Sequence, residues 1–141
     1  MTAPDSSVLI AGFVPSHRFH EAVLPSLAEV VRGGGGLIAH TIAETYSVLS
    51  SPAGPYRAEP SAVVAYLEQF LSGGPTIAAT SAAYRRALDL LSAAGRSGGA
   101  IYDALIALAA VDAGAVLVSL DRRAERVYGL CGAEVRFLDA A

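Results

Sequence analysis

The chain has 141 residues, a length that suits one domain with a hydrophobic core of its own. Hydrophobic residues make up 53% and charged residues 16%, which excludes a disordered chain, and the net charge of −3 argues against a generally basic nucleic-acid binder. All basic residues are arginine. The lack of lysine excludes a Walker A phosphate loop, a Schiff-base enzyme and a lysine-dependent receiver domain.

Short apolar runs alternate with longer amphipathic stretches, the pattern of β–α–β units and a mainly parallel sheet. In chain order, the first half predicts a very short strand ending near Asp5, helices over 7–12 and 19–31, a strand over 37–39 and a helix over 41–50. The glycine run 33–36 is interpreted as a flexible turn.

The second half continues the alternation. It predicts helices over 63–71, 83–94, 100–113 and 122–128, and strands over 76–79, 116–120 and 135–138. No repeat or linker interrupts this order, so we expect a single domain over residues 1–141. No apolar run reaches the about 18 residues that span a bilayer, and we expect a cytoplasmic protein with no membrane partner. The single Cys131 is interpreted as a buried hydrophobic residue.

Four carboxylates, Asp5, Glu44, Asp103 and Asp121, stand near predicted junctions between strands and helices. Asp5 and Asp121 each end a predicted strand, and ligands of an open parallel sheet bind beyond such strand ends where the strand order reverses. If the two strands are neighbours, both side chains face one crevice. A pocket of carboxylates suits Mg²⁺ or Mn²⁺ and supports phosphodiester chemistry.

Asp103 makes the strongest case for a metal. Its neighbours on the predicted helix are apolar, and an ionised carboxylate on a buried face needs a positive partner. No arginine lies on that helix, which leaves a metal ion. Each acid also has a structural alternative: Asp5 and Asp121 as helix caps, Asp103 as a helix-dipole partner, and Glu44 in a capping box with Thr41. For Glu44 alone, the capping box is favoured.

Four segments in order, 5–9, 43–44, 101–107 and 119–124, resemble the successive motifs of PIN-domain ribonucleases, specifically the VapC-type toxins of bacterial toxin–antitoxin pairs. The resemblance implies a three-layer α/β fold whose central, mainly parallel five-stranded sheet is flanked by helices. It implies Mg²⁺ or Mn²⁺ held by Asp5, Glu44, Asp103 and Asp121, with Ser7 and Ser119 as supporting polar groups. It also implies endonucleolytic cleavage of structured RNA, such as tRNA or rRNA, and a small antitoxin protein as partner.

The first strand departs from the family pattern. Only four residues precede Asp5, and Pro4 cannot donate a ladder hydrogen bond in a central strand. Either the strand is unusually short or its true start lies upstream. Ser119 stands where threonine is more usual, which keeps the hydroxyl.

An acidic pocket repels RNA, so arginine must grip the RNA backbone. We predict this role for Arg122, Arg123 and Arg126, which follow Asp121, and for Arg96 in a glycine-containing loop. The apolar helices around 63–71 and 83–91 indicate a homodimer. The leading hypothesis is a metal-dependent endoribonuclease toxin. The alternatives are an RNA-processing nuclease of the same fold without an antitoxin, and a non-catalytic interaction module whose acids only cap helices.

Overall fold

Five short parallel strands form the centre of the protein, seen here as a computed structural model that describes residues 1–139. The last two residues of the domain expected over 1–141 lie outside this range. One hydrogen-bonded group has the order β1-β4-β5, and a second pairs β2 with β3. A parallel bridge between Thr2 and Gly35 joins the groups. The strands are β1 (Thr2–Pro4), β2 (Leu37–Ile38), β3 (Thr76–Ile77), β4 (Val116–Ser119) and β5 (Val135–Phe137).

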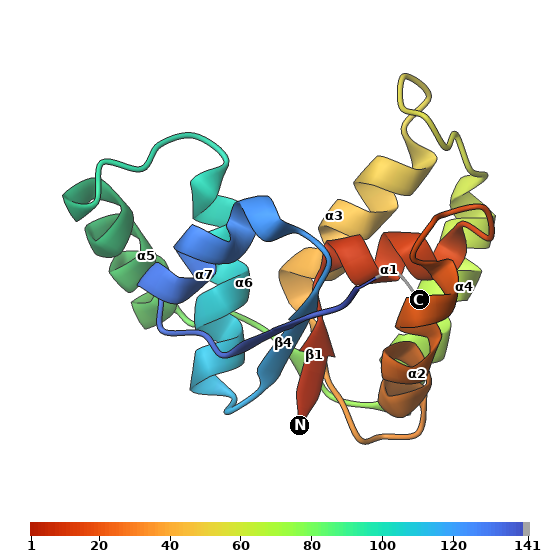
Figure 1. Cartoon of the computed structure of the whole chain (residues 1–141), viewed down its shortest axis with the longest axis horizontal. Helices are drawn as coiled ribbons and strands as arrows, with labels where there is room; N and C mark the ends of the chain where they lie inside the picture. The colour runs from red at the N-terminus through yellow and green to blue at the C-terminus, as the bar shows by residue number, and fades with distance from the viewer. Residues whose placement is uncertain (140–141) are drawn as a thin grey trace.

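Helices cover both faces of this sheet. Figure 1 shows α1, α2 and α4 on one side of β1 and β4, and α5, α6 and α7 on the other. The three-layer α/β fold expected from the sequence is therefore confirmed. None of the described helices is long and apolar enough to cross a membrane. Their bounds are α1 (Ser6–Phe13), α2 (His20–Val31), α3 (Ala39–Ser50), α4 (Pro60–Gly73), α5 (Ser81–Ala93), α6 (Ala100–Asp112), the 3-10 helix η1 (Arg122–Ala124) and α7 (Glu125–Leu130).

Successive residues of β4 pack into opposite layers. Leu117 lies in the apolar cluster formed with α5, α6 and α7, and Val118 lies in the cluster formed with α1, α2 and α4. This alternation follows from the period of two along a strand, and it places a core on each face of the sheet. In α6, every residue from 104 to 110 is buried, and Cys131 is buried in the same layer, as expected.

The predicted start of a helix at Thr41 is wrong, and with it the capping box. α3 begins at Ala39, directly after β2, and Ile38 is its N-cap residue. Thr41 lies inside the helix, fully buried, and its hydroxyl donates to the Ile38 carbonyl oxygen at 2.6 Å. The burial of this turn against the rest of the fold outweighs the local capping signal, because helix boundaries follow tertiary packing as well as propensity. Glu44 therefore has no cap to complete.

Pro4 occupies β1 without breaking its ladder. The residues at alternate positions bond to β4: the Val116 N–H donates to the Met1 carbonyl and the Asp5 N–H donates to the Val118 carbonyl, both at 2.9 Å. Pro4 faces the other way, toward β2, since strand residues alternate in direction. The pairing of β1 with β2 is limited to the bridge at Thr2, so the missing N–H of Pro4 costs no ladder bond. Within the described chain, β1 has three residues.

Candidate functional site

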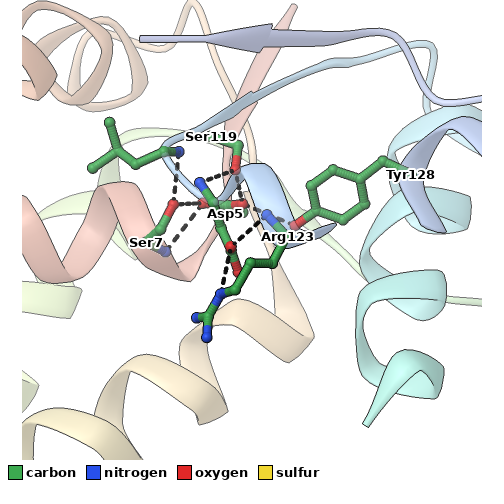
Figure 2. A network of polar contacts seen from close by, with 7 residues as sticks. Asp5, Ser7, Ser119, Arg123 and Tyr128 are labelled. Atoms are coloured by element: carbon green, nitrogen blue, oxygen red, sulfur yellow. Dashed lines mark hydrogen bonds and ion pairs between the residues drawn. The ribbon is translucent and has the colours of Figure 1, made fainter. Parts of the chain in front are cut away.

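Asp5 directly follows β1 and is only 2% exposed. Its Oδ1 accepts hydrogen bonds from the backbone N–H groups of Ser7 and Val8, at 3.0 and 3.4 Å, and from the Ser7 hydroxyl. Its Oδ2 accepts from the Ser119 hydroxyl and from the Tyr128 hydroxyl, the latter at 2.8 Å. Figure 2 shows these three side chains pointing at Asp5 from α1, the end of β4 and α7. The carboxylate is thereby held in one orientation.

Burial raises the pKa of Asp5, while the hydrogen bonds from Ser119, Ser7 and Tyr128 lower it. The two serines also bind the chain that follows β4. Ser7 Oγ accepts from the Leu120 N–H at 2.9 Å. Ser119 Oγ accepts from the Asp121 N–H at 3.0 Å. Each hydroxyl is thus donor and acceptor at once, which joins the carboxyl ends of β1 and β4.

The other three acids surround Asp5 with fewer contacts. Glu44, from α3, accepts a hydrogen bond from the Ser6 hydroxyl at 3.3 Å. Asp121 follows β4 and accepts from both the backbone N–H and the Nε of Arg123, at 3.0 and 3.3 Å (Figure 2). Asp103 lies in the first turn of α6.

These carboxylates act on one another electrostatically. Burial, followed by the charges of the other three acids, raises the pKa of Asp103 to about 6, although Arg123 opposes the rise. Burial also raises the pKa of Glu44, opposed chiefly by the charge of His40. A carboxyl whose pKa is raised by its neighbours reports an excess of negative charge around it. The fold therefore brings the four acids predicted from the sequence into one cluster, which we call the acidic cluster.

Two of the structural alternatives also hold. Asp5 is the N-cap residue of α1, and Asp121 caps η1 through the Arg123 backbone N–H. Capping does not exclude membership of the acidic cluster, because a residue between a parallel strand and the next helix lies at the carboxyl edge of the sheet by geometry. The strands that precede these two acids, β1 and β4, are neighbours, which was the condition for both side chains to face one crevice.

The donor set suits a hard divalent cation. It offers only carboxylate oxygens, and the charges of the other acids add to the rise that burial causes in the pKa of Asp103. Within residues 1–139, no group of three or more histidine, cysteine or carboxylate side chains is already arranged to hold a metal ion. Asp5 accepts hydrogen bonds on both oxygens, and Asp121 is paired with Arg123. The residues fit Mg²⁺ or Mn²⁺ by chemistry and charge.

Sequence analysis did not identify Tyr128 as a site residue. It appeared there only as the last residue of the helix predicted over 122–128. It is 2% exposed and shares the buried face of η1 and α7 with Ala124 and Val127. A buried tyrosine hydroxyl nearly always finds a hydrogen-bond partner. That rule was the available signal, but it does not identify Asp5 as the acceptor.

The four predicted RNA-binding arginines have different surroundings. Arg122 and Arg123 line a cleft of about 690 Å³ that also contains Ser6, Ser7 and Asp121, and which we call the arginine cleft. Arg96 instead lines a separate hollow with Leu88 and Ser92, and Arg126 is exposed on α7.

The protein thus has a parallel α/β sheet, an acidic cluster at the carboxyl edge of that sheet and arginine beside the cluster. This arrangement is typical of α/β nucleases, in which carboxylates hold a metal and arginine contacts phosphate. Comparison with known families specifies this class further. The PIN domain model matches residues 3–130 of the chain. The chain therefore belongs to the PIN-domain family, and its relatives identify it as a VapC-type member.

Two relatives come from Mycobacterium tuberculosis. Ribonuclease VapC40 is 42% identical over 138 residues, 98% of this chain and 99% of the relative. Ribonuclease VapC27 is 35% identical over 134 residues, 94% of this chain and 93% of the relative. Among solved structures, VapBC2 from Rickettsia felis bound to a promoter DNA fragment matches with a TM-score of 0.70 at 16% identity, over 98% of each chain. The VapC20 toxin of M. tuberculosis, which cleaves the sarcin–ricin loop, also matches with a TM-score of 0.70 at 16% identity, over 89% of this chain and 94% of that one. At 16% sequence identity, the similarity to these solved structures supports the fold alone.

Proposed function

We propose that this protein is a metal-dependent endoribonuclease that acts as the toxin of a toxin–antitoxin pair. The observation that carries the proposal is the acidic cluster, which gathers four carboxylates at the carboxyl edge of the sheet, where burial and then the charges of the other three acids raise the pKa of Asp103. The ribonuclease activity given in the names of the VapC relatives supports RNA as the substrate.

We assign Asp5, Glu44, Asp103 and Asp121 as the residues that hold Mg²⁺ or Mn²⁺. When bound, the ion supplies Lewis-acid chemistry: it lowers the pKa of water and neutralises the scissile phosphate. Asp121 must leave Arg123 to take part, which exchanges one charge contact for a stronger one.

The remaining residues orient the acids and receive the RNA. Ser7, Ser119 and Tyr128 keep Asp5 in a single orientation, which lowers the entropic cost of assembling the site. Arg122 and Arg123 present guanidinium groups beside the acids, where the RNA backbone would otherwise be repelled.

Purified protein should cut RNA in the presence of Mg²⁺ or Mn²⁺ and stop when a chelator is added. Asp103→Asn removes charge without changing volume and should lower the cleavage rate by about 100-fold or more, because a metal contributes several kcal/mol to such reactions. Asp89→Asn, on the exposed face of α5, is the matched control and should cut at the wild-type rate. Undiminished cutting by Asp103→Asn would overturn the metal-site assignment. Activity that survives chelation would exclude the metal-dependent mechanism.

A small antitoxin is the partner we propose, on the strength of VapC-type family membership. We propose that it binds in an apolar groove between α3 and α4, where Tyr46 is 40% and Val64 47% exposed. A short antitoxin-like reading frame should precede the gene, and co-expression with its product should yield a stable complex that no longer cuts RNA. Val64→Glu should weaken that complex and leave cleavage by the free protein unchanged.

We also propose that the protein forms a homodimer. Tyr84 and Leu88 on α5 are 51% and 61% exposed, large values for apolar side chains of this size. Light scattering after gel filtration should give twice the chain mass. Leu88→Glu should shift the distribution toward the monomer, and an unchanged monomeric wild type would contradict the proposal.

A further inference from the structure

The arginine cleft extends from the acidic cluster to the loop between α1 and α2. That loop supplies His17, Arg18 and Phe19 to one wall, and η1 supplies Arg122 and Arg123 to the other. The two walls come from segments about a hundred residues apart in the chain, and they meet next to the carboxyl ends of β1 and β4. In a protein of net charge −3, the cleft gathers arginine beside the most acidic point of the fold.

Two arginines of the cleft rest on aromatic rings. The Cζ of Arg18 lies 4.9 Å from the centroid of Phe19, and the Cζ of Arg122 lies 4.1 Å from the centroid of Phe137. A guanidinium stacked on a ring keeps its N–H groups free for a ligand while losing less side-chain freedom on binding. Arg122 also pairs with Glu125 at 3.2 Å, but both side chains are more than half exposed, so a phosphate can displace this pair.

His17 adds a ring N–H donor to the same cleft. Its Nδ1 accepts the backbone N–H of Phe19 at 3.1 Å. With Nδ1 acting as the acceptor, the ring hydrogen lies on Nε2, which is therefore the donor. Guanidinium and imidazole N–H groups thus line one cleft, which matches an anion with several acceptor oxygens.

We propose that the arginine cleft binds the phosphate of a nucleotide next to the scissile bond, with Arg18 and Arg122 as its anion-binding groups and His17 as an additional donor. This inference rests on the proposed ribonuclease function and adds the path of the RNA across the site. The volume of about 690 Å³ falls within the roughly 300–1,000 Å³ of small-ligand sites, enough for a nucleotide. Such a contact positions the strand without reading its sequence.

The test measures RNA binding as a function of salt in the Asp103→Asn background, which should bind without cutting. The probe is a short, fluorescently labelled single-stranded RNA of mixed sequence, titrated at several KCl concentrations. Arg18→Gln and Arg122→Gln should each weaken binding and flatten the plot of log K against log[KCl] by about 0.7, the slope of one phosphate contact on a single strand. Arg18→Lys keeps the charge and should keep the slope. Arg85→Gln, on exposed α5, is the matched control and should change neither quantity.

Two different failures can be told apart. If Arg18→Gln and Arg122→Gln change the slope no more than Arg85→Gln does, although the wild type cuts RNA with Mg²⁺, the phosphate subsite is wrong and the ribonuclease function stands. If the wild type does not cut RNA and the Asp103→Asn protein does not bind it, the proposed function fails and the subsite with it. Circular dichroism on each variant checks that a reduced slope of log K against log[KCl] does not result from unfolding.

Discussion

The polar contacts of Asp5 explain how a carboxylate can be almost wholly buried without a charged partner. Three hydroxyl groups and two backbone N–H groups share its two oxygens. Hydrogen bonds to the ionised form offset part of its desolvation cost, which favours the charged form that the proposed metal site needs. Tyr128 carries the most distant of these hydroxyls, 123 residues along the chain.

Tyr128→Phe removes only the hydroxyl oxygen and so tests whether Tyr128 orients the Asp5 carboxylate. The substitution keeps the ring that packs in the core and leaves Asp5 Oδ2 with the Ser119 hydroxyl alone. Loss of such an orienting bond lowers metal affinity or activity by roughly 10- to 100-fold. Calorimetric titration with Mn²⁺ measures the affinity separately from catalysis. Tyr84→Phe, on an exposed face, is the control, and an unchanged Mn²⁺ affinity in Tyr128→Phe would contradict the positioning role.

Glu44→Gln separates the two roles that the sequence left open for this residue. The capping box is absent from the structure, so the amide should leave the free energy of unfolding at or above the wild-type value, because it removes a repelled charge. The hydrogen bond from Ser6 can persist to the amide oxygen. RNA cleavage should fall with Mg²⁺ as the metal. A clear loss of stability, measured by urea unfolding, would restore the structural role.

How far the sequence predicts the site differs from residue to residue. Asp5 and Asp121 could be placed together because each ends a strand, and strand ends share an edge of a parallel sheet. Tyr128 could not be placed there, because its acceptor depends on where the fold brings α7 relative to the end of β1, a contact that spans 123 residues of sequence. Arg18 was missed for the same reason: nothing local indicates that the α1–α2 loop faces η1.

At the scale of elements, the predicted order of strands and helices is correct, and the errors lie at boundaries. The start of α3 was placed at Thr41 because a threonine followed by glutamate three residues later is a strong local signal. The real helix begins two residues earlier, where the short β2 ends. The helix predicted over 122–128 is divided into η1 and α7, because Asp121 caps a 3-10 turn first. Local propensity alone predicts neither the start of α3 nor the division of the last helix, because both depend on packing in the folded protein.

Gly35→Ala tests the junction between β1 and β2. A Cβ at this position would lie 2.8 Å from the Thr2 carbonyl oxygen and 2.9 Å from Val30 Cγ2, so the strands would have to separate. We expect the free energy of unfolding to fall by about 1–3 kcal/mol, the usual range for overpacking. Gly129→Ala in α7 meets nothing within 4 Å and should instead stabilise the protein by about 0.5–1 kcal/mol. Urea unfolding compares the two; equal effects would contradict the close approach.

At the scale of the whole molecule, we expect the acidic cluster to destabilise the metal-free protein and to stabilise the protein once the proposed cation is bound. The two apolar layers hold β1 and β4 side by side, and this fixes the acids near one another whether or not they repel. The fold therefore supplies the free energy that opposes the repulsion. A cation that binds the folded state alone returns that free energy by mass action.

The stability of the metal-free protein should consequently depend on pH through this cluster. The pKa of Asp103 is raised from its ordinary value of 3.8 to about 6, and burial raises those of Asp5 and Glu44 in the same direction. A raised pKa means that the folded state binds the proton more tightly than the unfolded state. The stabilising contribution is thus fully present below about pH 4 and is lost as the pH rises through about 6.

Asp103→Asn should reveal this effect, because asparagine stays neutral at every pH. In a chelating buffer, the variant and the wild type should be equally stable near pH 4, and the variant should be the more stable one at pH 7, by on the order of 1 kcal/mol after allowance for solvent screening. Saturating Mg²⁺ or Mn²⁺ at pH 7 should reverse the order, since only the wild type gains the full binding energy. Thermal unfolding across pH 4 to 7, with and without metal, measures both. A variant that is less stable than the wild type by the same amount at every pH would show that Asp103 serves the fold and not the cluster.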